Sequence, residues 1–318
     1  MVTTKRLVLA HIALFLVALF YAATFTFAKA VMNGGYLQPF GFILLRVICA
    51  TILFWIVHAI FIREKVRFQD LKKLAVCGIF GVAVNMLLFF EGLSLTTPIH
   101  GSLIMLTTPI LVLIFGFFFH KEPITILKVL GVCLGLGAAF YLTISNSGQL
   151  NKTAPNPVLG NFLIGVNAAS YAIYLNIVSP LMAKYNPITL LKWIFTFGFI
   201  YVCPFGMAPL REAEWSSFPT YIWYLIAFVI ICATFFTYLL NGSALRVVKP
   251  SVVSSYVYLQ PVLASTIAIS LGKDKLSTEL ITAGCLILVG VYMVSYRKAS
   301  PFKKKEKPRQ QEITTTTR

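Results

Sequence analysis

Ten long apolar stretches fill most of this 318-residue chain and constrain its fold more than any other feature. Apolar residues make up 58% of the sequence and charged residues only 12%, whereas a soluble domain is about half apolar and a quarter charged. A helix needs about 20 mainly apolar residues to cross a membrane. The sequence therefore predicts an all-α integral membrane protein with ten transmembrane helices. The predicted helices are 7–31, 38–61, 74–95, 98–119, 126–144, 158–179, 188–209, 220–240, 249–271 and 280–297.

Basic residues predict how these helices are oriented. Short turns join the stretches, so consecutive helices must be antiparallel. With a cytoplasmic N-terminus, the outer loops contain only Lys152, Arg211, Lys273 and Lys275 of the 27 basic residues. The positive-inside rule favours this orientation. We expect both termini to be cytoplasmic, the bundle to lie in the inner (plasma) membrane of the cell, and residues 298–318 to be a basic, disordered tail.

This topology explains the formal net charge of +17 without a nucleic-acid partner. The sequence also lacks the motifs of many enzymes: H-E-x-x-H, G-x-S-x-G and Walker A patterns are absent, and the four histidines are scattered. The six cysteines lie in six different stretches, which argues against a disulfide or metal framework. We therefore predict that the protein is not an enzyme and uses no metal or cofactor.

The two halves of the chain resemble each other, which predicts an internal duplication. A shift of 152 residues places Pro109 on Pro261, and a shift of 146 residues places Arg46 on Lys192 within matching Leu-Leu-basic triplets. Because each half has five helices, the second half inserts upside down relative to the first. The predicted organisation is a first repeat at 1–144, an outer linker at 145–157, a second repeat at 158–297 and the tail at 298–318.

These repeated residues also carry a resemblance to a known family. They include Phe27-Ala28-Lys29, Leu45-Arg46, the segment from Ser102 to Pro109, and the glycines Gly131 and Gly137. Over about residues 8–297, the chain resembles the ten-helix EamA-type permeases of the drug/metabolite transporter superfamily. The resemblance implies a secondary transporter that exports a small metabolite, amino acid or drug-like solute by alternating access. The alternative function is a channel or a lipid scramblase.

Two prolines inside predicted helices indicate where a substrate would bind. Pro109 and Pro261 lie near the middle of their stretches, and each frees the carbonyl four residues earlier, on Met105 and Val257. Inside a bilayer such a carbonyl must face protein or a water-filled cavity. Discontinuous helices at the midplane often form the binding site of carriers. We predict helix breaks here, with Gln260 as a polar neighbour; packed kinks without a ligand are the alternative.

Charged residues within the apolar stretches are further candidates. Arg46 is costly to place in a membrane, so we expect it to face the interior of the bundle and to meet a carboxylate, a carbonyl or an anionic substrate. Lys192 and Lys29 are the other basic candidates for substrate binding, although both side chains can also extend to the lipid headgroups. Glu91 either pairs with one of these cations or takes up the proton that couples transport.

Polar and aromatic residues complete the predicted site. Side chains on the third, sixth and ninth helices are candidates for the cavity lining, with packing as the alternative for the aromatic ones. The expected partners are membrane lipids and a small-molecule substrate, for which an anion is one interpretation. The spacing Gly131-x-x-x-Gly135 allows close helix contact, either within the chain or in a homodimer. The lining candidates are Asn85, Tyr171, Tyr174, Tyr256 and Gln260.

Overall fold

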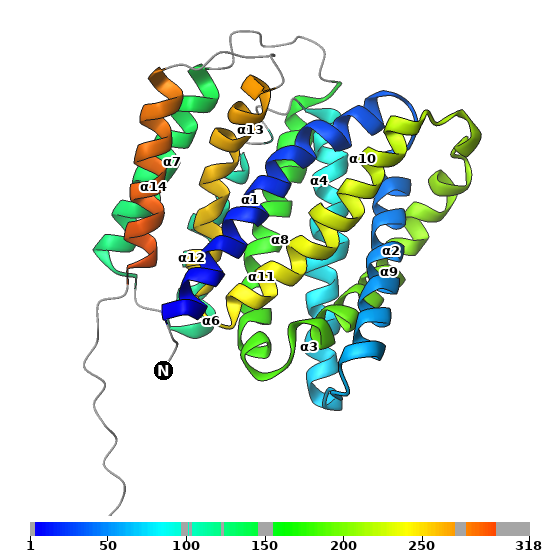
Figure 1. Cartoon of the computed structure of the whole chain (residues 1–318), viewed down its shortest axis with the longest axis horizontal. Helices are drawn as coiled ribbons and strands as arrows, with labels where there is room; N and C mark the ends of the chain where they lie inside the picture. The colour runs from blue at the N-terminus through cyan, green and yellow to red at the C-terminus, as the bar shows by residue number, and fades with distance from the viewer. Residues whose placement is uncertain are drawn as a thin grey trace, which may run out of the picture.

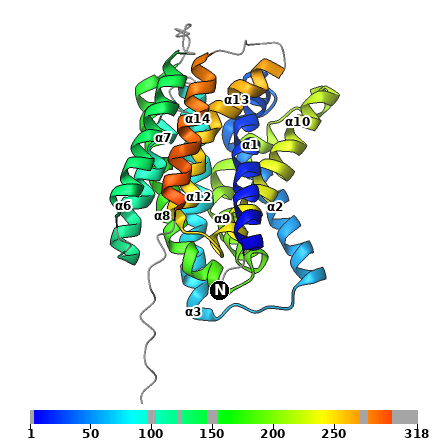
Figure 2. The same cartoon turned by 60° about the vertical axis from the view of Figure 1, so that its left-hand side comes forward.

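The computed structural model describes residues 4–96, 101, 104–121, 124–145, 155–270 and 278–296. Within these ranges all regular structure is helical, as the sequence predicts, and helices occupy all ten predicted stretches. Six of the described helices are long and apolar enough to cross a membrane, and shorter apolar helices accompany them. The helices pack side by side in one bundle (Figures 1 and 2). The predicted tail and most of the predicted outer linker, residues 146–154, lie outside the described residues.

The first repeat contains the helices up to residue 145. Its third stretch is one continuous span from Phe68 to Leu95, which begins six residues before the predicted start. In the polar first turns of this span, the Asp70 side chain binds residues of the other repeat, as described below. The elements are α1 (Thr4–Asn33), α2 (Pro39–Phe61), α3 (Phe68–Gly78), a π-helical turn (η1, Ile79–Ala83), α4 (Val84–Leu95), α6 (Thr108–His120) and α7 (Ile126–Ser145).

The second repeat has the same order of spans. It again contains a π-helical turn in its third span and an interruption in its fourth. The elements are α8 (Pro157–Lys184), α9 (Pro187–Arg211), the short 3₁₀ turn η2 (Trp215–Ser217), α10 (Thr220–Ile230), the π-helical turn η3 (Ile231–Phe236), α11 (Thr237–Leu245), α12 (Pro250–Ser255), the 3₁₀ turn η4 (Tyr256–Tyr258), α13 (Leu259–Ser270) and α14 (Thr278–Ser295).

Both prolines predicted to break helices lie directly after an interruption. In the first repeat the chain leaves the helix at residues 106–107, and the Ile104 carbonyl accepts hydrogen bonds from the Thr107 backbone N–H (3.0 Å) and hydroxyl (2.7 Å). Pro109 then occupies the first turn of α6, where a missing N–H costs nothing. In the second repeat η4 precedes α13, which contains Pro261 in its first turn. The two repeats thus share a discontinuous fourth span.

Close helix contacts through glycine hold one edge of the bundle together. There α7 packs against α14, while α2 packs against α9 at the opposite edge (Figure 1). A Cβ atom on Gly131 would lie 2.7 Å from the Gly290 carbonyl oxygen, and a Cβ on Gly290 would lie 2.7 Å from the Gly131 carbonyl oxygen. The Gly131 face of α7 is therefore used within the chain, between the last helices of the two repeats.

Replacing Gly131 by alanine is therefore expected to destabilise the bundle. The added methyl group would force α7 and α14 apart, at a cost of about 1–3 kcal/mol. Gly137→Ala is the matched control, because its Cβ would meet nothing within 4 Å and alanine favours a helix by about 1 kcal/mol. Thermal unfolding of both variants in detergent measures the difference. Equal unfolding temperatures would contradict this close contact.

Candidate functional site

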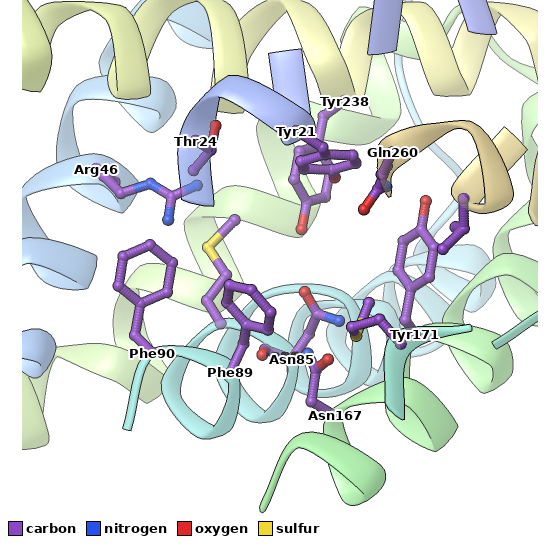
Figure 3. A pocket seen from close by; sticks show the side chains of 13 residues that line it. Tyr21, Thr24, Arg46, Asn85, Phe89, Phe90, Asn167, Tyr171, Tyr238 and Gln260 are labelled. Carbon is purple, nitrogen blue, oxygen red and sulfur yellow. Dashed lines mark hydrogen bonds between the residues drawn. The ribbon is translucent and has the colours of Figure 1, made fainter. Parts of the chain in front are cut away.

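A cavity lies between the two repeats, next to both helix interruptions (Figure 3). The centres of water molecules can reach about 80 Å³ of it, which is room for several waters. Its lining is mainly apolar, with a few polar side chains set among aromatic and methionine residues. We call it the central cavity. It is lined by Tyr21, Thr24, Arg46, Asn85, Met86, Phe89, Phe90 and Met105 of the first repeat and by Asn167, Tyr171, Tyr238, Val257 and Gln260 of the second.

Equivalent positions of the two repeats meet at this cavity. Met105 and Val257, which the 152-residue shift superposes, lie beside the two helix interruptions and both line it. Tyr21 and Asn167, which the 146-residue shift superposes, also both line it. The central cavity therefore lies where the duplicated halves face each other, and each half supplies part of its wall.

Arg46 is the most unusual residue of the lining. Its side chain extends from α2 and is only 3% exposed. The Nε atom donates a hydrogen bond to the Thr234 hydroxyl of η3 (3.0 Å), and the guanidinium carbon lies 4.8 Å from the centre of the Phe90 ring. The terminal nitrogen Nη1 is buried and has no hydrogen-bond partner among the described residues. Figure 3 shows the guanidinium pointing into the space between Thr24 and Phe90.

The charge of Arg46 is not balanced by an acid in the cavity wall. None of the described lining residues is acidic, and Arg46 forms no ion pair within the described part of the chain. Glu91, one residue beyond Phe90, is half-buried, lies outside the lining and pairs with no cation among the described side chains. The cavity thus has a positive end. Such a charge inside a bilayer is expensive unless a partner of opposite charge can reach it.

Hydrogen bonds between the repeats hold the backbone around η1 and the start of α4 in place. The π-helical turn η1 shifts the backbone register of its span and leaves carbonyls without their usual helical donors. Side chains of the second repeat supply donors for carbonyls in and next to this turn. The three bonds are Ser170 Oγ to the Phe80 carbonyl (2.7 Å), Tyr238 Oη to the Gly81 carbonyl (2.6 Å) and Asn167 Nδ2 to the Asn85 carbonyl (2.6 Å).

Four residues that the sequence indicated as substrate-binding candidates line the central cavity: Arg46, Asn85, Tyr171 and Gln260. They come from α2, α4, α8 and α13, so only the tertiary structure brings them together. Figure 3 places Arg46 at one end of the cavity and Gln260 with Tyr171 toward the other. Pro109 and Pro261 stand close by in sequence but are not part of the lining.

Other candidates lie outside the cavity. Tyr174 packs against Tyr171, with ring centres 6.0 Å apart, and forms the layer behind it. The Tyr256 hydroxyl is 2.7 Å from His11 Nδ1 on α1, which ties η4 to the first helix. The side chain of Lys29 lies outside the described residues.

Lys192, the repeat equivalent of Arg46, neither lines the cavity nor extends to the headgroups. Its side chain is 6% exposed. The ammonium nitrogen lies 3.1 and 3.2 Å from the two ring nitrogens of His58 and 4.5 Å from the centre of the Trp55 ring. The structure therefore places this cation in the contact between α2 and α9, so the repeats are not equivalent in their charged residues.

Several lining residues were not identified from the sequence. Tyr21, Thr24, Asn167 and Tyr238 belong to this group. The alignment of the two repeats could have indicated Tyr21, Thr24 and Asn167. These three residues belong to the matching segments 21–25 and 167–171, and both segments line the cavity. Met86, Phe89 and Phe90 have no such signal, since apolar residues on an apolar helix reveal no preferred face.

A second polar cluster joins the repeats at the end of the bundle where α1 begins (Figure 1). The Asp70 carboxylate of α3 forms an ion pair with Lys184 and accepts a hydrogen bond from the Tyr185 hydroxyl (2.7 Å). The Glu64 carboxylate accepts a hydrogen bond from the Asn186 backbone N–H (2.9 Å). These five residues, which we call the polar clamp, connect the α2–α3 region of the first repeat to the α8–α9 turn of the second.

Comparisons with known proteins match the chain over almost its whole length. The sequence model of the EamA-like transporter family matches residues 8–144 and 158–296. An uncharacterized transporter of Archaeoglobus fulgidus is 29% identical, over 89% of this chain and 97% of that protein. The uncharacterized transporter YyaM of Bacillus subtilis is 25% identical, over 87% of this chain and 90% of its own.

A more distant relative and a solved structure extend these matches. A WAT1-related protein of Arabidopsis thaliana is 22% identical, over 91% of this chain and 84% of its own. One crystal structure superposes with a TM-score of 0.70 at 18% identity, covering 92% of this chain and 97% of that one. This last likeness shows the fold alone.

Proposed function

Because the chain belongs to the EamA-like transporter family, we propose that it is a secondary transporter whose central cavity binds a small solute and opens alternately to each side of the membrane. The solute would be a metabolite, amino acid or drug-like molecule, and export is the direction that the family resemblance implies. The observation that carries the proposal is the position of the cavity, between inverted repeats and beside two discontinuous helices.

The polar clamp supports alternating access. It joins the repeats at one end of the bundle, so the path from the cavity to that end can open only if the two repeats separate there. The start of α1 and the end of α14 lie at this same end (Figure 1). With the orientation that the positive-inside rule favours, the clamp is on the cytoplasmic side, and residues 62–67 at this end are strongly basic.

Reconstitution tests the proposal directly. A thermal-shift screen of the purified protein against amino acids, organic acids, nucleosides and drugs identifies a ligand, because a ligand that binds the folded state raises its stability. Uptake of that ligand, in labelled form, is then measured in proteoliposomes. We expect saturable uptake that unlabelled ligand on the opposite side accelerates. Empty liposomes are the control, and uptake that rises linearly without saturation would contradict a carrier.

A further inference from the structure

We infer that the solute carries a carboxylate on an apolar body and that Arg46 binds this carboxylate; the inference rests on the proposed function and assigns its substrate class. Among the described residues only Nε of Arg46 has a hydrogen-bond partner, the Thr234 hydroxyl, whereas Nη1 is buried without one. A buried charged donor without a partner costs free energy, and an anion in the cavity would remove that cost.

The geometry of the arginine favours a carboxylate. A guanidinium presents its terminal N–H groups as a planar fork that matches the two oxygens of a carboxylate. Phe90 lies beside this plane, and Thr234 holds Nε, so the fork is fixed in position before a ligand arrives. A solute group that approaches from the cavity meets the free edge of the fork (Figure 3).

The charge of the lining distinguishes the possible solutes. Since none of the described lining residues is acidic, an amine or other organic cation would meet Arg46 without a compensating carboxylate. A doubly charged phosphate would bring two negative charges to one cation in a mainly apolar space, which leaves one charge unpaired. A single carboxylate balances the charge of the site.

The remaining wall defines the rest of the solute. Met86, Phe89 and Met105 line the cavity, and Figure 3 places Phe89 between the Arg46 end and the Gln260 end. Methionine and aromatic side chains pack well against apolar groups of varied shape. A solute with its carboxylate at Arg46 would therefore place an apolar body here. Gln260 at the far end offers a hydrogen bond to a polar group.

A matched charge series tests this inference. Hydrocinnamate, hydrocinnamamide and phenylpropylamine share one apolar body and carry a carboxylate, a neutral amide and a cationic amine. Binding of each is measured by calorimetry on the full chain in lipid nanodiscs. We expect hydrocinnamate to bind at least about tenfold more tightly than the amide, and the amine to bind more weakly still. Tighter binding of the amide or the amine, or no hydrocinnamate binding up to its solubility limit, would overturn the inference.

Variants identify the residue responsible. In Arg46→Gln the preference for hydrocinnamate over its amide should fall to about onefold. Arg46→Lys keeps the charge but not the fork, so it should retain the preference with lower affinity. Arg211→Gln removes an exposed charge at the end of α9 and should leave the preference as in the wild type. An unchanged preference in folded Arg46→Gln would overturn the role of Arg46. If Arg46→Gln does not fold, the charge series on the wild type and on Arg46→Lys decides.

Transport measurements distinguish a failure of this inference from a failure of the proposed function. If saturable transport is found but amides or amines are preferred, the substrate class is wrong and the transporter function stands. If hydrocinnamate binding depends on Arg46 but no bound ligand crosses the membrane, the binding site stands and the proposed function is wrong.

Discussion

Arg46→Met is expected to transport at less than about 5% of the wild-type rate and yet to unfold at a higher temperature. The guanidinium is buried, and one of its terminal nitrogens has no partner among the described residues. In the empty protein the free-energy cost of removing this charge from water is therefore not offset. Methionine fills a similar volume without a charge, and such replacements of buried charges often stabilise by about 1–3 kcal/mol. Loss of the anion contact removes about 2–5 kcal/mol from binding, which corresponds to a loss of about 30-fold to several thousandfold.

Two measurements on the same preparation check this prediction. Thermal unfolding in detergent reports stability, and uptake of the screened ligand in proteoliposomes reports transport. Thr234 keeps its own hydrogen bond to the Val229 carbonyl (2.8 Å), so the substitution leaves this hydroxyl with a partner. A drop in unfolding temperature would mean that Arg46 holds the fold together, and wild-type transport would remove it from the site. Arg211→Gln serves as the charge-loss control, with both quantities unchanged.

Joining Asp70 to Lys184 covalently is expected to stop transport. The two side chains form an ion pair in the polar clamp, and a zero-length carbodiimide converts such a contact into an amide bond. The bond would tie α3 of the first repeat to the end of α8 in the second, so that this end could no longer open. We expect transport to fall in proportion to the cross-linked fraction, and at least about tenfold when cross-linking is complete. The cross-linked fraction is measured by mass spectrometry of the joined peptides.

The matched control is Lys184→Arg. Arginine retains the ion pair with Asp70 but its guanidinium does not form the amide, so carbodiimide treatment should leave its transport unchanged. This control also accounts for reaction of the reagent with other carboxylates. Wild-type transport by fully cross-linked protein would show that the clamp stays closed throughout the cycle, and the proposed opening at this end would then be wrong.

The helical fold could be predicted from the sequence because the membrane acts on each stretch separately. A run of apolar residues long enough to span the bilayer must form a helix there, since lipid cannot bind free backbone groups. This requirement is local, so the ten stretches follow from it, while their duplication follows from the matching residues of the two halves. The start of the third span could not be predicted in this way, because its charged first turns depend on Asp70 pairing with Lys184 from the other repeat.

The π-helical turns were beyond prediction for a similar reason. An irregular turn such as η1 is tolerated in a membrane only if its carbonyls find donors, and those donors are Tyr238 and Ser170 of the second repeat. Nothing in residues 79–83 alone indicates that such partners will be present. The two prolines differ in this respect, because proline removes its own backbone donor and so marks an interruption from the sequence alone.

For the site, the sequence shows which residues are unfavourable inside a membrane, whereas helix packing fixes what each of them contacts. A basic residue inside an apolar stretch is conspicuous whatever surrounds it, so Arg46 and Lys192 both stood out. Their uses differ because Arg46 extends into a cavity whose described lining residues include no acid, whereas Lys192 lies against His58 and Trp55 in a helix contact. Charge is a property of one residue. Its partner comes from helices far away in the chain, so only packing decides whether that partner is the protein or a solute.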